Sequence, residues 1–233
     1  ISKELATIID ESWAGERLLP PEHDDLKMAY HLAQEARAGL TEFRIPAIFN
    51  GTLFDFQTAA VKIAAHHLNK RGGVLIGDVV GLGKSMMATA LAKVFEDDYH
   101  TETLVICPKN LVPMWEDYVH RYRLHAKVLS LSRVLNELPE KTRRYRLVLI
   151  DESHNLRNKD GKRWKVIREY IERNESLTVL LSATPYNKTY LDLSAQLGLF
   201  LNEDADIGIR PEHLLKDLGG EHEFIRRHQC GVR

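Results

Sequence analysis

The chain has 233 residues, 44% hydrophobic and 28% charged, so it can bury a sizeable core and is neither a disordered chain nor a collagen-like fibre. Its 32 basic and 33 acidic side chains leave a net charge of -1, which gives no global electrostatic case for binding nucleic acid. Its two cysteines, Cys107 and Cys230, exclude a disulfide scaffold and suit a reducing compartment; both are interpreted as filler thiols.

The two ends of the sequence suggest a piece of a longer cytoplasmic protein. It begins Ile1-Ser2-Lys3-Glu4, without an initiator Met or the pattern of a signal peptide, and stops at residues 230–233 without a helix ending. No apolar run reaches the ~20 residues that span a bilayer, so no membrane partner is expected.

Residues 1–50 are predicted to form a helical extension or linker. Pro20-Pro21 interrupts the chain, and apolar residues then recur at helical spacing up to Gly39. The predicted main lobe covers residues 51–200, and residues 201–233 are expected to begin a connection to a second lobe.

From residue 53 onward, short apolar runs alternate with longer amphipathic stretches. This alternation predicts an α/β fold with a parallel sheet that is buried on both faces. Ligands of such sheets bind at the carboxyl ends of the strands. The predicted strands are 73–77, 103–107, 127–131, 147–150 and 178–181, and the predicted helices are 84–95, 110–122, 161–173 and 189–200.

The first predicted strand runs into a glycine-rich turn, DVVGLGKS over residues 78–85, and then into a helix. Gly81 and Gly83 allow close approach of phosphate oxygens, and the new helix adds its positive dipole end. Lys84 can reach the β- and γ-phosphates of a nucleotide, and the Ser85 hydroxyl can bind magnesium. The strict pattern has glycine where this chain has Asp78.

The strand 147–150 delivers two adjacent carboxylates, Asp151 and Glu152, to the same edge of the sheet. One can hold the magnesium shell while the other orients and deprotonates an attacking water, as phosphoanhydride hydrolysis requires. An isolated pair of this kind is more often a helix cap with a surface charge, but the upstream phosphate loop favours catalysis. His154 is a candidate coupling residue, with a simple polar role in its loop as the alternative.

Three segments follow one another in the chain: GLGKS over residues 81–85, DESHNLRN over 151–158 and LSATP over 181–185. In this order they resemble motifs I, II and III of superfamily 2 helicases, and most closely those of the Swi/Snf-type ATPases, particularly bacterial ones. LFDFQ, ending at Gln57, resembles the adenine-recognising Q motif, with Phe56 in place of Tyr. CPKNLVPMW, ending at Trp115, resembles motif Ia. The resemblance covers residues 53–200.

The resemblance implies a P-loop NTPase with a RecA-like three-layer α/β/α sandwich, a mainly parallel sheet, and ATP and Mg²⁺ as cofactors. Gln57 would read the adenine, and the triphosphate would be cradled by Gly81, Leu82, Gly83, Lys84 and Ser85. Asp151 and Ser85 would position magnesium, and Glu152 would activate water. The nucleotide state would be coupled to the nucleic-acid track by Ser182, Ala183 and Thr184. Pro108 and Lys109 would lie beside that track.

Family members use two such lobes, with arginine fingers from the second, and no second phosphate motif is found between residues 186 and 233. The resemblance therefore implies a second RecA-like lobe in the same parent chain, and slow hydrolysis by the isolated chain. An attached nuclease domain is a further candidate partner.

Basic residues between Arg157 and Arg168, Lys162 and Arg163 among them, are either a solvated helix face or a surface that tracks nucleic-acid phosphates. Trp115 could stack on a base, but its helical spacing with Leu111 and Val119 favours the core.

The sequence thus predicts the first motor lobe of a DNA-dependent ATPase that moves on duplex DNA or remodels protein–DNA complexes, of the broad DEAD/DEAH-box type. A strand-separating helicase or a restriction or defence motor is an alternative within the fold. A nucleotide-binding switch without productive hydrolysis is the alternative from another class.

Overall fold

The computed structural model describes residues 39–77, 82–138, 143–185, 190–202 and 219. Residues 38–205 group as one compact unit. The predicted helix that follows Pro20-Pro21, the turn residues Asp78 and Gly81, and nearly all of the predicted connection over 201–233 lie outside the described residues.

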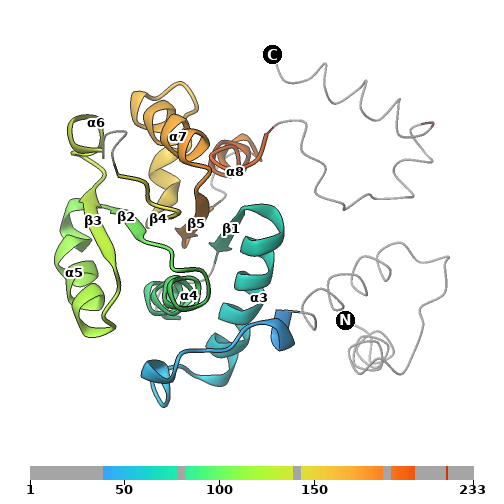
Figure 1. The fold of residues 1–233 in the computed structure, drawn as a ribbon. Coiled ribbons are helices and arrows are strands. Elements are labelled where there is room, and N and C mark those ends of the chain that lie inside the picture. The colour runs from blue at the N-terminus through green and yellow to red at the C-terminus, as the bar shows by residue number, and fades with distance from the viewer. Residues whose placement is uncertain (1–38, 78–81, 139–142, 186–189, 203–218, 220–233) are drawn as a thin grey trace. The chain divides into compact units, whose positions relative to one another are not determined.

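A five-stranded, entirely parallel sheet forms the centre of the unit (Figure 1). The strand order is β1-β5-β4-β2-β3, so the third and fourth strands of the chain are not neighbours and β4 is central. The strands are β1 (Gly73–Gly77), β2 (Thr103–Cys107), β3 (Ala126–Ser130), β4 (Leu147–Ile150) and β5 (Leu177–Ser182). The five predicted strands and their parallel arrangement are confirmed; β3 begins and ends one residue earlier than predicted, and β5 is one residue longer at each end.

Helices cover both faces of the sheet, which makes the three-layer α/β/α sandwich that the sequence predicts (Figure 1). Helices α3 (Asp55–Arg71), α4 (Lys84–Tyr99) and α5 (Val112–Arg121) lie on one face. The other face carries α6 (Val134–Glu137), α7 (Lys162–Asn174) and α8 (Tyr190–Leu197). Short 3-10 turns are η1 (Ala47–Phe49), η2 (Lys109–Leu111) and η3 (Ser153–Leu156).

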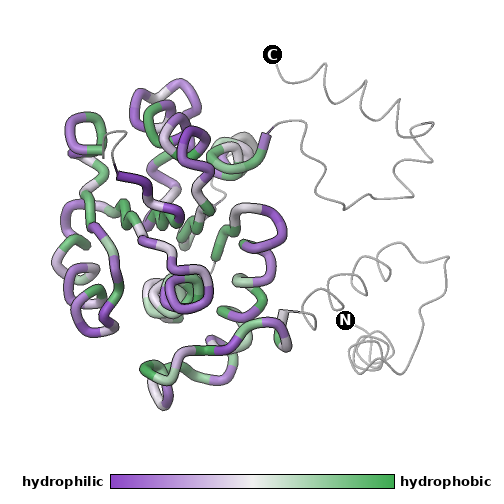
Figure 2. Tube along the Cα trace, viewed as in Figure 1, coloured by the Kyte–Doolittle hydropathy of each residue, from purple (hydrophilic) through white to green (hydrophobic). Residues whose placement is uncertain are grey.

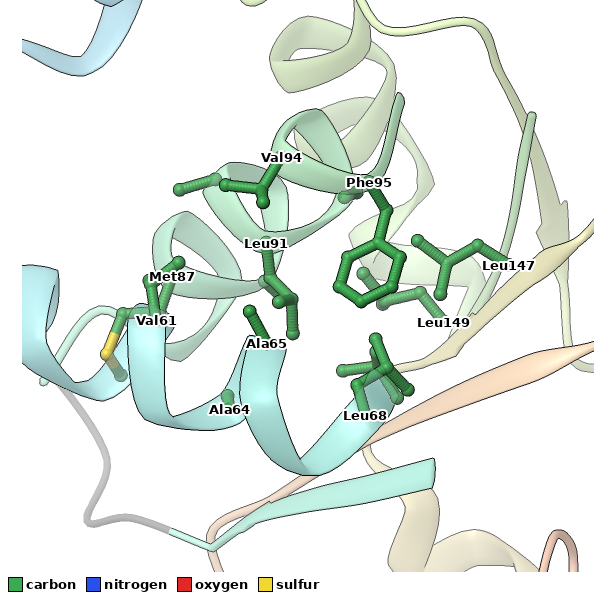
Figure 3. Packing of buried hydrophobic residues seen from close by; sticks show 14 of the residues in the cluster. Val61, Ala64, Ala65, Leu68, Met87, Leu91, Val94, Phe95, Leu147 and Leu149 are labelled. Atoms are coloured by element: carbon green, nitrogen blue, oxygen red, sulfur yellow. The ribbon is translucent and has the colours of Figure 1, made fainter. Parts of the chain in front are cut away.

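Alternate residues of the buried strands supply two separate cores. In β4, Leu147 and Leu149 pack against α3 and α4, as Figure 3 shows, whereas Val148 and Ile150 belong to the core beneath α7. Hydrophobic residues therefore concentrate along the strands, with polar residues on the outer faces of the helices (Figure 2). Because both faces are covered, the strands are almost continuously apolar in sequence.

The described part of the predicted amino-terminal extension packs onto this lobe. Phe43 and Phe49 are buried, and their rings stack on Phe95 of α4 and on Tyr122 after α5, with centroid separations of 5.9 and 4.5 Å. Burial of two phenylalanine side chains stabilises the contact by roughly 3–6 kcal/mol before ordering costs. Residues 43–49 are thus part of the folded unit.

Candidate nucleotide-binding site

The predicted site segments follow strands that lie side by side. The phosphate loop follows β1, the SATP segment ends β5 and continues beyond it, the acidic pair follows β4, and Pro108 follows β2. Because all strands are parallel, these segments meet at one edge of the sheet. Burial raises the pKa of Asp151 above its ordinary value, and the charge of Lys84 is one of the smaller influences that oppose this rise, so the lysine lies close enough to act on the carboxylate.

The described end of the phosphate loop has a geometry that requires glycine. Gly83 has φ +80°, and a Cβ atom built on it would lie 2.4 Å from Nε2 of Gln57. Gly83 immediately precedes α4, so Lys84 and Ser85 occupy its first turn, where the backbone N–H groups and the positive end of the helix dipole favour an anion. This is the arrangement expected of a phosphate site.

Gln57 ties α3 to this loop. Its buried amide accepts a hydrogen bond from the Phe54 backbone N–H through Oε1 (3.0 Å) and donates one from Nε2 to the Leu82 carbonyl (2.9 Å). Phe54 and Phe56 beside it are exposed, with stacked rings 6.0 Å apart. The adenine-reading role of Gln57 stays a prediction, while its contact with the phosphate loop is a finding that sequence reasoning missed.

Three hydrogen bonds hold Asp151 at the end of the central strand. Its backbone N–H donates to the Ile106 carbonyl of β2 (2.8 Å). Its carboxylate accepts from the Trp115 indole at Oδ2 and from the Glu152 N–H at Oδ1, both at 2.9 Å. Burial raises the pKa of Asp151 above its ordinary value, and these two hydrogen bonds oppose that rise.

Glu152 has an unusual backbone and an oxygen available for a further hydrogen bond. Its φ and ψ of 50° and 49° are left-handed, a conformation that costs a non-glycine residue about 1–2 kcal/mol. Oε2 is buried and lies 3.0 Å from His154 Nδ1, yet it accepts no hydrogen bond from the described residues. Strain and an unsatisfied acceptor together are typical of a functional carboxylate.

The predicted coupling residues contact one another. His154 Nδ1 lies 3.4 Å from Ser182 Oγ, and this oxygen accepts a hydrogen bond from the Thr184 N–H (3.2 Å). Arg157 donates to the carbonyl and hydroxyl oxygens of Thr184, at 2.6 and 3.2 Å. Ala183 lies between these two anchored residues. The segment after β4 is therefore bonded to the segment after β5.

A third tie between these segments comes from Gln196 of α8, which sequence reasoning missed. The Gln196 side chain is fully buried, accepts from Ser153 Oγ (2.8 Å) and donates to the carbonyls of Pro185 (2.7 Å) and Asp192 (3.0 Å). A glutamine between Ala195 and Leu197 in an apolar helix segment is the only sequence signal of this role, and it does not identify the partners.

Trp115 lies wholly in the core, as its helical spacing predicts. The alternative that it stacks on a nucleic-acid base is wrong, because its ring is fully buried. Its bond to Asp151 could not be foreseen, since the two residues are 36 positions apart.

The predicted nucleic-acid residues differ in their surroundings. Lys109, Lys162 and Arg163 are exposed, whereas Pro108 is half-buried. Arg157 is also half-buried and donates to Thr184, so its guanidinium has a structural partner as well as the predicted phosphate role.

The oxygen atoms present suit magnesium bound mainly through nucleotide phosphates. Among the described residues, no group of three or more His, Cys, Asp or Glu side chains could hold a metal by itself. Mg²⁺ commonly binds through one or two protein oxygens together with phosphates and waters. The Ser85 hydroxyl and the Asp151 carboxylate fit that pattern.

A parallel sheet of this order, covered by helices on both faces, is typical of a RecA-like α/β lobe. The SNF2-related domain family matches residues 56–138. A Sulfolobus solfataricus SWI2/SNF2 ATPase core in complex with dsDNA superposes with a TM-score of 0.55 and 17% identity, covering 72% of this chain and 40% of that one. The Pyrococcus furiosus Hef helicase domain gives 0.52 and 16%, covering 67% and 38%.

Two curated relatives agree with this family. A Caenorhabditis elegans homolog of the SWI/SNF-related matrix-associated actin-dependent regulator of chromatin subfamily A-like protein 1 is 25% identical over 63% of this chain. Helicase SWR1 of Debaryomyces hansenii is 21% identical over 64%. The chain spans 24% and 11% of their respective lengths. The resemblance to Swi/Snf-type ATPases is thus confirmed, but these eukaryotic relatives give no support to a bacterial origin or to a DEAD/DEAH-box subtype.

None of the helices in the described part of the chain is both long and apolar enough to cross a membrane.

Proposed function

We propose that this chain is the ATP-binding first motor lobe of a DNA-dependent ATPase that moves on duplex DNA or remodels protein–DNA complexes in the cytoplasm. The observation that carries the proposal is the convergence of Lys84, Ser85, Asp151 and Glu152 at one edge of the sheet, with Glu152 Oε2 unsatisfied. Cleavage of a phosphoanhydride requires a phosphate site, a metal-binding oxygen and a base close together.

The residues divide the work as follows. The first turn of α4 binds the phosphates, with Lys84 neutralising their charge, and Ser85 and Asp151 would hold Mg²⁺, which stabilises charge on the phosphates when bound. Glu152 orients a water and accepts its proton as the water oxygen attacks the γ-phosphorus. The bond to the β–γ bridging oxygen breaks, and ADP and phosphate leave.

Duplex DNA is the proposed track because of the relatives and the exposed basic residues. The solved SWI2/SNF2 core described above is bound to dsDNA. In this chain, Lys109, Lys162 and Arg163 are exposed and could contact phosphates without reading bases. Binding would then be independent of sequence and strongly dependent on salt.

Efficient turnover is proposed to need a second RecA-like lobe from the same parent chain. Absence of an arginine finger costs on the order of 10³–10⁵ in rate. The isolated 233 residues should therefore bind Mg–ATP weakly and hydrolyse it very slowly. Fast turnover by this chain alone would contradict the proposal.

Two other functions use the same site. A strand-separating helicase, or a restriction or defence motor with an attached nuclease, would share the nucleotide chemistry and differ in what the motion does. A nucleotide switch would bind ATP without productive hydrolysis. The strained, unsatisfied Glu152 favours the hydrolytic functions, since a switch has no need of a poised base.

The test is ATP turnover by the full-length protein with duplex DNA, with single-stranded DNA and without DNA. We expect strong stimulation by duplex DNA, abolished by Glu152→Gln and retained by Glu169→Gln, a matched change at an exposed carboxylate of α7. Displacement of a labelled strand would favour the helicase. ATP retained stoichiometrically without turnover would contradict the motor and favour the switch.

A further inference from the structure

The hydrogen bond between Trp115 and Asp151 joins two predicted functional regions. The indole Nε1 of Trp115 donates to Asp151 Oδ2 at 2.9 Å, and both side chains are buried, with 0% and 6% of their surface exposed. We infer that Trp115 is a positioning residue that fixes the Asp151 carboxylate and links its orientation to helix α5. The inference rests on the proposed ATPase function.

The carboxylate is fixed by donors from two different elements. The Glu152 N–H, on the same loop, holds Oδ1, and the indole, on α5, holds Oδ2. An ionised carboxylate has about four acceptor sites, so each oxygen keeps one for the magnesium shell. Without the indole, one restraint is lost and the group can rotate about its terminal torsion, which has a broad energy well.

Helix α5 connects Trp115 to the segment predicted to lie beside nucleic acid. The turn η2 begins at Lys109 and is closed by a bond from the Leu111 N–H to the Pro108 carbonyl (2.9 Å). Helix α5 starts at the next residue and carries Trp115 in its first turn, packed edge-on against Tyr118 at 6.0 Å. A rigid helical element of this kind can transmit a displacement between two sites.

The Trp115–Asp151 hydrogen bond can transmit a change from the nucleic-acid side of α5 to the acidic pair. Nucleic acid bound at the exposed Lys109 would shift the start of α5, and the indole would carry that shift to Asp151. Stimulation of turnover by DNA would then depend in part on the indole N–H. A purely structural tryptophan would leave both the magnesium dependence and the stimulation unchanged.

The experiment compares Trp115→Phe with Trp164→Phe in the full-length protein. Both changes keep an aromatic ring and remove an indole donor, since Trp164 Nε1 donates to the Ala195 carbonyl at 2.8 Å. Loss of a residue that orients a metal ligand typically costs 10–100-fold in metal affinity or activity. We expect Trp115→Phe to raise the Mg²⁺ concentration for half-maximal binding of a fluorescent ATP analogue by about tenfold.

We expect Trp115→Phe to bind the analogue normally when Mg²⁺ is absent. The stimulation of its ATP turnover by duplex DNA is expected to fall. Trp164→Phe is expected to behave as wild type in both assays. Equal Mg²⁺ dependence and equal stimulation in the two variants would overturn it. Failure of the proposed function is distinguishable, because the wild type would then show no stimulated turnover at all.

A second measurement does not depend on the variant folding. The indole N–H resonance of Trp115 in ¹⁵N-labelled wild-type protein is expected to shift when Mg²⁺ is added in the presence of ADP. Trp115→Phe assigns the resonance if it folds, and selective labelling assigns it otherwise. An indole resonance that ignores Mg²⁺ at saturating ADP would overturn the inference.

Discussion

The two ends of the candidate site are held together in different ways. At the phosphate loop, the geometry is set by one hydrogen bond from the Gln57 amide and by the left-handed backbone of Gly83. The proposed anion is bound there by backbone N–H groups at the start of α4. At the acidic end, side chains make the connections, among them Ser153 to Gln196 and Arg157 to Thr184.

This difference separates nucleotide binding from the coupling of nucleotide state to movement. A backbone cradle depends on local conformation and changes little while its glycine is intact. A set of side-chain hydrogen bonds between two loops can break and reform together, and so can couple nucleotide state to movement. We therefore expect changes at the phosphate loop to abolish binding, and changes at the acidic end to affect stability and coupling.

The largest effect on nucleotide affinity is expected from Gly83→Ala. The added methyl would meet Gln57 Nε2 in a backbone conformation that already disfavours side chains. We expect binding of a fluorescent ATP analogue to weaken on the order of 10²-fold, or about 3 kcal/mol.

The matched control is Gly72→Ala, at the end of α3. Gly72 has a similar φ of +74° but open space around its missing Cβ. It should lose about 1 kcal/mol of unfolding free energy and keep normal nucleotide binding. Equal binding losses in both variants would mean that general destabilisation by a strained residue, and not the contact with Gln57 in the loop, weakens binding.

Gln196→Met tests the acidic end. It leaves the buried Ser153 hydroxyl and the Pro185 carbonyl without their partner, so the free energy of unfolding should fall by about 1–3 kcal/mol in urea denaturation. Ser153→Ala completes a double-mutant cycle, whose coupling energy we expect at about 0.5–3 kcal/mol. Strict additivity would contradict a direct tie between the two segments.

A smaller effect, on the salt dependence of DNA binding, is expected from the exposed basic residues at the start of α7. Lys162→Gln with Arg163→Gln should reduce the slope of log affinity for duplex DNA against log salt by about 0.9 for each phosphate that the protein no longer neutralises. Arg121→Gln, at an exposed residue near the end of α5, serves as the control. An unchanged slope in the double variant would assign Lys162 and Arg163 to a merely solvated face.

The smallest effect is expected at Cys107, the last residue of β2. Burial raises the pKa of its thiol to about 12, with the Asp151 and Glu116 carboxylates adding to the rise. At pH 8 only ~10⁻⁴ of the thiol would be ionised, so iodoacetamide should not label Cys107 in folded Cys230→Ser protein. Urea should expose the Cys107 thiol to labelling. Rapid labelling of the folded protein would contradict the burial of this thiol at the end of β2.

The sequence predicts those parts of the site that are continuous in the chain. Two stretches are local patterns whose chemistry depends on immediate neighbours in the chain: the one from β1 through Gly83 to Ser85, and the one from Leu147 to Glu152. The strands could be located because burial on both faces makes them apolar throughout. The sequence places His66 and His67 on a helix but gives no bounds for this helix, α3, whose buried face includes small residues such as Ala64 and Ala65.

The remainder depends on pairs that are distant in sequence. Trp115 and Asp151 are 36 residues apart, and Ser153 and Gln196 are 43 apart. Nothing in a tryptophan or a glutamine on a helix identifies a partner on another loop. Such contacts follow from the strand order, which places β4 between β2 and β5, and this order is a property of the whole fold.

The most direct test of the proposed chemistry is single-turnover hydrolysis by the full-length Glu152→Gln protein, with its ATP affinity measured separately. We expect nearly unchanged Mg–ATP binding and hydrolysis slower by at least about 10²-fold, the usual contribution of a general base. Hydrolysis at the wild-type rate, with binding intact, would contradict the assignment of Glu152 as the base and, with it, the proposed chemistry of the site.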